Sequence, residues 1–346
     1  KIDPNDPLGY DVYAKTLWSR IEHALNRDPH NTELGDDPLV VGLFGEWGVG
    51  KSYLLDKIQA RATAKQKELA ARRRRDGGFD LLIPVSFQPW KYEHEEHLHV
   101  PILLHVLAAL ETGIADSLTF WETAAGMAQK PGDAAIKAMP KAVSLFKKVV
   151  FGTAAALDPA TTVAVASTQV LADHAATAAD KRAASKNPPT ASALKYTGDG
   201  RYYYEIHKIL KAVCRPGKYP DLQANKLLND VFRVNFVIFV DDLDRCLPEK
   251  AVAVLELIKT IFNVESFAFV LALDDEVIER GIGHRYSAYL LKDKKPQMPI
   301  TGFEYLEQVV HLPFRFPALT RAQASAFVRW TEQSVESNSA LHWFAP

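Results

Sequence analysis

Cysteine is scarce in this chain of 346 residues, and neither sign of charge is in excess. The two cysteines, Cys214 and Cys246, form no metal-ligand spacing, which argues against a disulfide scaffold or a cysteine-based zinc site and suits a reducing cytoplasm. The 41 Lys+Arg residues are matched by 42 Asp+Glu residues, a net charge of −1. This balance provides no general argument for binding to nucleic acid or to a membrane.

Long, strongly apolar runs are also missing. The most apolar stretch, residues 149–172, is largely alanine and threonine and is interrupted by Asp158 and Pro159. A bilayer offers no water to such a charge, so we expect no membrane crossing here. Residues 119–195, rich in alanine and broken by glycine and proline, are predicted to form a helical insertion for oligomer or partner contacts.

One motif for phosphate binding is present in full. An apolar run at 39–44, predicted to be a buried strand, leads into GEWGVGKS at 45–52, and a helical pattern comes next. The eight residues fit G-x-x-x-x-G-K-[ST], and the strand before and helix after them make a chance glycine-rich turn the weaker interpretation. Such a loop points backbone N–H groups and a helix N-terminus at phosphate oxygens.

The motif assigns chemical roles to individual side chains. Lys51 is predicted to reach the β- and γ-phosphates of ATP and to act in catalysis, and the Ser52 hydroxyl to bind Mg²⁺. The residues expected to contact the nucleotide are Gly45, Glu46, Trp47, Gly48, Val49, Gly50, Lys51, Ser52 and Tyr53.

A second predicted strand, residues 235–240, ends in the pair Asp241 and Asp242. One carboxylate can hold Mg²⁺ through water while another orients or deprotonates an attacking water. Because neighbours on a strand point to opposite faces, the sequence leaves open which acid faces the phosphate. Capping of a helix by these acids is the alternative. The predicted strand at 267–273 also ends in an acid, Asp274.

Several stretches together resemble the KAP family of P-loop NTPases. They are GEWGVGKS at 45–52, FQPWKY at 87–92, VDDLDRC at 240–246, FVLALD at 269–274 and YLEQVVHLPFRFP at 305–317. The resemblance implies that 45–52 is Walker A and that Asp241 is the Walker B magnesium ligand. It also implies that Asp242 is a candidate catalytic carboxylate and that Asp274 has a sensor-like position.

The resemblance implies an α/β fold, a P-loop NTPase with a mainly parallel sheet flanked by helices. We expect the nucleotide domain in two parts, 1–118 and 196–317, separated by the insertion at 119–195. Residues 318–346 are expected to begin a helical region that continues in a longer protein. Members of the family often carry paired transmembrane helices between the Walker motifs, from which the alanine-rich insertion departs.

Three functions compete at this point. The first is an Mg²⁺-dependent ATPase that switches or drives an assembly, with a homo-oligomer and an effector protein as partners. The resemblance extends to bacterial members found in anti-phage defence systems. The second is a scaffold that binds ATP and scarcely hydrolyses it, and the third is a P-loop kinase, which the paired aspartates and the lack of an Arg-rich lid disfavour. A stimulating arginine could come from a neighbouring subunit or from this chain, where the candidates are Arg245, Arg280, Arg285 and Arg315.

Overall fold

The computed structural model describes residues 6, 8–26, 37–70, 79–95, 98–123, 206–207, 210–211, 213–215, 232–285, 302–318 and 320–337. The predicted insertion at 119–195 lies outside the described residues except for its first five, which continue a helix. The apolar spacing of residues 202–214 predicts a helix, and most of this range lies outside the described residues as well.

Five parallel strands form one sheet, which confirms the predicted α/β class. In chain order they are β1 (Leu39–Phe44), β2 (Phe79–Phe87), β3 (Phe232–Val240), β4 (Phe267–Leu273) and β5 (Leu312–Arg315). Their order across the sheet is β2-β3-β4-β1-β5, and every pairing is parallel. Strand β4 therefore lies between the strand that leads into the P-loop and the strand that ends at Asp241.

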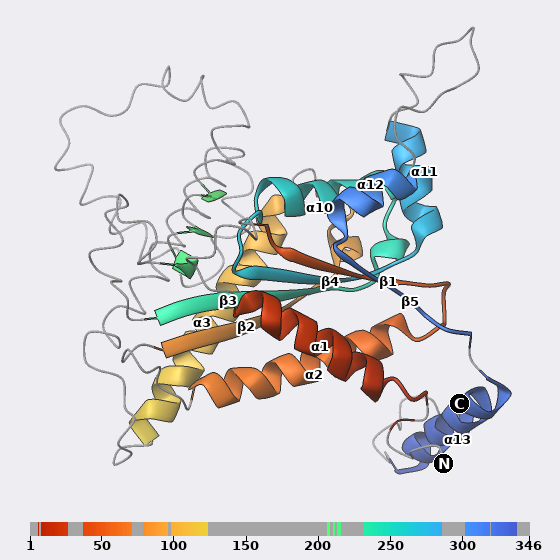
Figure 1. Cartoon of the computed structure of the whole chain (residues 1–346), viewed down its shortest axis with the longest axis horizontal. Helices are drawn as coiled ribbons and strands as arrows, with labels where there is room; N and C mark the ends of the chain where they lie inside the picture. The colour runs from red at the N-terminus through yellow and green to blue at the C-terminus, as the bar shows by residue number, and fades with distance from the viewer. Residues whose placement is uncertain are drawn as a thin grey trace, which may run out of the picture.

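Helices cover both faces of this sheet, as Figure 1 shows. On one face lie α1 (Asp11–Leu25) and α2 (Lys51–Ala70). On the other lie α3 (His99–Thr123), α10 (Pro248–Thr260), α11 (Asp275–Arg285) and α12 (Gly302–Val309). This arrangement explains why the central strands are apolar at nearly every position: parallel strands with helices on both faces have no solvent-facing side.

The alternation of side chains along β1 divides the core into two parts. Val41 and Leu43 pack among the residues of α1 and α2, whereas Val40 and Phe44 pack on the face covered by α10 and α12. Successive residues of a strand point to opposite faces, so one short apolar run contributes to both parts of the core.

Helix α3 is a core helix of the sheet. Among the described residues, one segment, His99–Ser117, has the length and apolar composition of a membrane span, and half of that window is buried inside the structure. Its buried side chains, among them Ile102, Val106 and Leu110, pack with those of the sheet. The apolar composition of α3 is therefore explained by its packing on the sheet.

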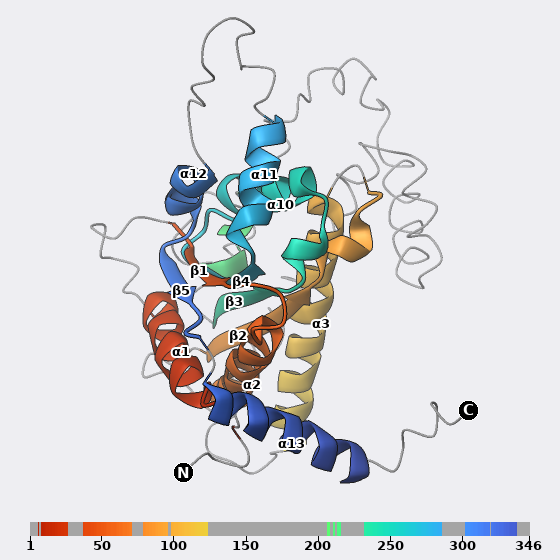
Figure 2. The same ribbon diagram turned by 90° about the vertical axis from the view of Figure 1, so that its right-hand side faces the viewer.

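The last described helix, α13 (Arg321–Ser337), returns to the amino-terminal end of the chain (Figure 2). Gln323 Nε2 donates a hydrogen bond of 3.0 Å to the Leu8 carbonyl. Segments more than 300 residues apart in sequence are thereby joined beside the first turn of α1.

The strand register collects several chain segments at one edge of the sheet. Phe87 pairs with Val240, and Phe44 pairs with both Leu273 and Arg315. The segments after these strands emerge at the same edge. That is where open α/β sheets bind ligands.

Helices α10 and α11 lie in close contact at Gly281. A Cβ at this position would lie 2.8 Å from the carbonyl carbon of Pro248, and nearer still to its oxygen. In open space, Gly→Ala within a helix stabilises by about 0.5–1 kcal/mol. Here we expect Gly281→Ala to lower the free energy of unfolding by about 1–3 kcal/mol, because backbone must move. Urea denaturation measures the change, and a variant more stable than the wild type would contradict this packing.

Candidate functional site

The P-loop has a backbone that only glycine adopts readily at two positions. Gly48 has φ 84° and Gly50 has φ 99°, both in the left-handed region. At Gly45 the loop closes tightly, since a Cβ there would lie 2.8 Å from Val49 Cγ1. The loop is therefore shaped to curl around a compact ligand, as the motif predicts.

Lys51 begins helix α2, and its ammonium group is fully engaged. It donates to the Gly45 carbonyl at 2.7 Å and to the Glu46 carbonyl at 3.2 Å. It also forms an ion pair of 2.8 Å with Asp244 Oδ2, in which the two side chains are 7% and 8% exposed. The contact with Asp244 was not foreseen from the sequence.

Ser52 and Asp241, both predicted to bind Mg²⁺, are in contact at this edge of the sheet. The Ser52 hydroxyl donates to Asp241 Oδ1 at 3.0 Å, although 189 positions separate the two residues. A hydroxyl and a carboxylate are hard oxygen ligands of the kind Mg²⁺ prefers. These two residues fit a magnesium site and would hold the ion there.

Asp242 has the single left-handed conformation among described non-glycine residues, with φ 58° and ψ 31°. Its carboxylate lies 2.7 Å from Arg245 Nε. Burial, followed by the negative charge of Asp241, raises the pKa of Asp242 above the ordinary aspartate value, against opposing effects of Arg245 and a hydrogen bond from Trp90. A raised pKa favours proton acceptance, so Asp242 has one property of a general base.

Arg245 connects the turn of residues 241–245, which we call the aspartate turn, to the tip of the P-loop. Its guanidinium carbon lies 5.6 Å from the centre of the Trp47 ring, in a cation–π arrangement. Trp47 is 76% exposed, unusually high for tryptophan. Of the four arginines considered from the sequence, Arg245 is therefore beside the phosphate loop.

Two of the other candidate arginines, Arg280 and Arg315, have acidic partners on α11. Arg315 forms a 2.7 Å ion pair with Asp275, and Arg280 forms one of 2.9 Å with Glu276. Arg315 also lies over the ring of Phe44, which places it at the end of β1. The side chain of Arg285 lies outside the described residues.

Asp274 comes directly after β4 at the predicted edge and caps the helix after it. Its Oδ1 accepts a hydrogen bond of 3.0 Å from the Glu276 backbone N–H. This contact suits an acid at a helix N-terminus. A sensor role for Asp274 stays a prediction.

Two further acids belong to the site, in addition to those singled out from the sequence. Asp244 contacts Lys51 directly. Asp56, one turn along α2 from Ser52, has a raised pKa, first because of burial and second because of the charge of Asp241. The helical spacing of four residues between Ser52 and Asp56 was the available signal.

Tyr10, the residue directly before α1, contacts the P-loop. Its hydroxyl donates to the Val49 carbonyl at 2.8 Å, and a Cβ on Gly50 would lie 3.0 Å from its ring. Burial, followed by the nearby Tyr13, raises the pKa of Tyr10 to about 12, so the hydroxyl keeps its proton at neutral pH. The Phe316 ring packs 5.4 Å from the Tyr10 ring, so the segment after β5 contacts the same support.

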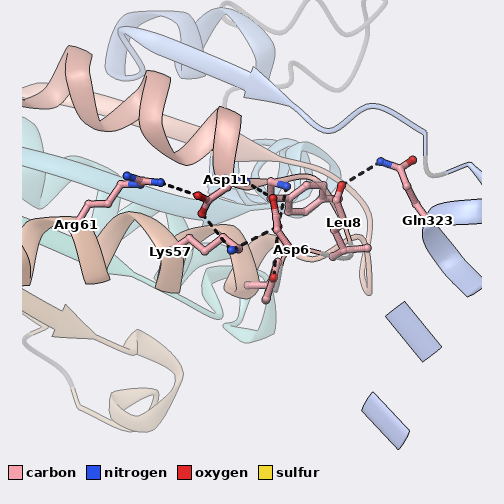
Figure 3. A network of polar contacts seen from close by, with 8 residues as sticks. Asp6, Leu8, Asp11, Lys57, Arg61 and Gln323 are labelled. Carbon is pink, nitrogen blue, oxygen red and sulfur yellow. Dashed lines mark hydrogen bonds and ion pairs between the residues drawn. The ribbon is translucent and has the colours of Figure 1, made fainter. Parts of the chain in front are cut away.

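A polar network fixes Tyr10 in place (Figure 3). Asp6 accepts hydrogen bonds from the backbone N–H groups of Tyr10 and Asp11, at 3.0 and 2.7 Å, and so caps the start of α1. Lys57 and Arg61 of α2 then pair with Asp11 at 3.1 and 3.0 Å. The helix that begins with Lys51 is thus attached to α1 along two turns.

A comparison against known protein families agrees with this site. The site combines a glycine loop, a lysine, and a serine that is hydrogen-bonded to the aspartate directly after a parallel strand. The model described as KAP family P-loop domain matches residues 10–343. The chain belongs to the KAP family.

Curated relatives match this KAP domain over limited segments. The proteins named "Kinase D-interacting substrate of 220 kDa" from Rattus norvegicus and Homo sapiens are each 27% identical over 81 residues, 23% of this chain and 4% of theirs. The "Phage T7 exclusion protein" of Escherichia coli (strain K12) is 26% identical over 84 residues, 24% of this chain and 10% of its own length. The matches therefore span a small part of each relative.

Replacement of Tyr10 by phenylalanine tests the support of the P-loop. Tyr10→Phe leaves the Val49 carbonyl without this donor, at a cost of about 1 kcal/mol. We expect the dissociation constant for Mg-ATP to rise roughly three- to tenfold. Tyr13→Phe, which removes a hydroxyl from the same aromatic cluster, is the matched control in equilibrium titrations. Equal affinities for wild type and Tyr10→Phe would show that the contact does not support the binding loop.

Proposed function

We propose that this KAP domain is an Mg²⁺-dependent ATPase that couples ATP binding and hydrolysis to assembly or switching of a multi-subunit complex. The observation that carries the proposal is the meeting of Ser52 and Asp241 at 3.0 Å beside Lys51. A lysine for phosphate charge and two oxygen ligands for a cation are the minimum set for P-loop phosphoryl chemistry.

The residues divide this work by position. The backbone of 45–50 and the start of α2 bind phosphate oxygens, and Lys51 neutralises their charge. Ser52 and Asp241 would hold Mg²⁺, which when bound withdraws charge from the phosphate oxygens. Asp242 is our candidate to orient the attacking water, supported by its place next to Asp241 and by its raised pKa.

The larger context is also a proposal. We propose a homo-oligomer with an effector protein, located in the cytoplasm, in which residues 119–195 supply contacts between subunits. A role in anti-phage defence is supported by the partial similarity to a protein named for phage T7 exclusion. It is further supported by the resemblance of the motifs to those of bacterial defence ATPases.

Phosphate release from Mg-ATP, measured without any acceptor, tests the ATPase proposal. We expect continuous release by the wild type. Lys51→Ala should abolish release and weaken ATP binding at least about tenfold, because the γ-phosphate charge loses its one side-chain cation from the loop. Lys67→Ala, in the last turn of the same helix, is the control for charge. Tight ATP binding by folded Lys51→Ala would refute the site, and binding without release by the wild type would favour a nucleotide-gated scaffold.

The two adjacent acids should differ in their effects. Asp242→Asn is expected to keep Mg-ATP binding and to slow hydrolysis by roughly 100-fold or more, the scale of a positioned acid or base. Asp241→Asn should raise the Mg²⁺ concentration needed for ATP binding, because it removes a ligand. Mg²⁺ titrations and single-turnover rates separate the two effects. Normal hydrolysis by Asp242→Asn together with normal Mg²⁺ dependence of Asp241→Asn would show that the roles are assigned wrongly.

A further inference from the structure

The ammonium group of Lys51 has no donor left for a phosphate. A lysine ammonium has three N–H donors, and Lys51 directs its contacts at two carbonyls and at Asp244. Before it can donate to a nucleotide, at least one of these contacts must be given up.

The partner that a triphosphate displaces most readily is Asp244. The two carbonyls belong to the loop that surrounds the ligand and are neutral. Asp244, in contrast, bears a negative charge 2.8 Å from the ammonium that the γ-phosphate also needs. Phosphate attracts Lys51 and repels Asp244, so both electrostatic effects act against this ion pair.

The backbone of the aspartate turn explains why Asp244 reaches Lys51. The left-handed conformation at Asp242 reverses the chain after β3 and starts the 3-10 turn Leu243–Arg245. Leu243 is fully buried and anchors this turn in the core. The turn directs the Asp242 carboxylate at the guanidinium of Arg245 and the Asp244 carboxylate at the ammonium of Lys51. A strained conformation at such a place is typical of a functional site.

We propose that Asp244 is a specificity-determining residue that competes with the γ-phosphate for Lys51. This inference rests on the proposed function, in which the nucleotide phosphates reach Lys51. The β-phosphate of ADP can take the donor that Lys51 now directs at a loop carbonyl, so ADP binds with the Lys51–Asp244 pair largely retained. ATP adds the charge of the γ-phosphate at the same ammonium and must separate the pair. Asp244 therefore lowers the affinity for ATP more than the affinity for ADP, and ties the opening of the pair to the third phosphate. A ligand shifts such an equilibrium only through different affinities for the two states.

Replacement of Asp244 by asparagine tests this competition. The dissociation constants of a non-hydrolysable ATP analogue and of ADP are measured with Mg²⁺ for the wild type and Asp244→Asn. We expect the variant to bind the ATP analogue about tenfold more tightly and ADP less than about threefold more tightly, within the usual range of coupling between sites. Asp275→Asn, the same change at the same sheet edge in a residue paired with Arg315, should alter both constants less than about twofold.

Several results would overturn the proposal. One is weaker or unchanged binding of the ATP analogue by Asp244→Asn, and another is an equal gain for both nucleotides, which would indicate a general charge effect. Asp244→Glu, which keeps the charge, should keep the wild-type ratio of the two constants, and a ratio like that of Asp244→Asn would count against competition. If Asp244→Asn does not fold, Asp244→Ser replaces it with the same expected ratio.

The outcome also separates this inference from the ATPase proposal. If the wild type binds both nucleotides in a Lys51-dependent way and Asp244→Asn does not change their ratio, only the competition is refuted. If the wild type binds neither nucleotide, both proposals fail.

Discussion

The parallel register of β1, β3 and β4 is the constraint on which the site depends. Parallel strands deliver their carboxyl ends to one edge, so the P-loop after β1 and the aspartates after β3 come together although 189 positions separate Ser52 from Asp241. Strand β4 between them holds the two ends at a set distance. The continuous burial of β1 and β4 makes this spacing resistant to change, because either strand could shift only by disrupting both parts of the core.

Ionisable side chains are concentrated at this edge of the sheet, and the Lys51–Asp244 pair among them is nearly buried. Three acids that are close in sequence, Asp241, Asp242 and Asp244, each have a different neighbour: Ser52 for Asp241, Arg245 for Asp242 and Lys51 for Asp244. Acids with separate partners can respond separately to a bound phosphate, which makes distinct roles possible for residues that are adjacent in sequence.

The elements outside the sheet also converge on the P-loop. Tyr10 contacts Val49, Phe316 packs on Tyr10, and Gln323 binds the Leu8 carbonyl. Residues before β1 and after β5 are therefore in physical contact with the loop that would change on nucleotide binding. The curated relatives share 10% or less of their length with this chain, so most of each relative lies outside the matched segment.

The sequence by itself determined the phosphate loop, the apolar strands and the acids at their ends. These features are local: a strand, a glycine turn and a helix succeed one another within residues 39–70, and the period of apolar residues specifies each element. The strand bounds expected for β1 and β4 agree with the structure. The motif residues Lys51, Ser52 and Asp241 could all be named in advance for the same reason.

Only the tertiary structure decided which partner each of these side chains has. The Lys51–Asp244 pair depends on the left-handed turn at Asp242, and no periodicity in the sequence signals that conformation for an aspartate. The contact between Tyr10 and Val49, which are 39 positions apart, depends on how α1 packs against α2. The helix-capping contact of Asp274 likewise becomes visible only when the start of α11 is placed. Such contacts arise from the packing of whole elements, and local sequence patterns carry no information about them.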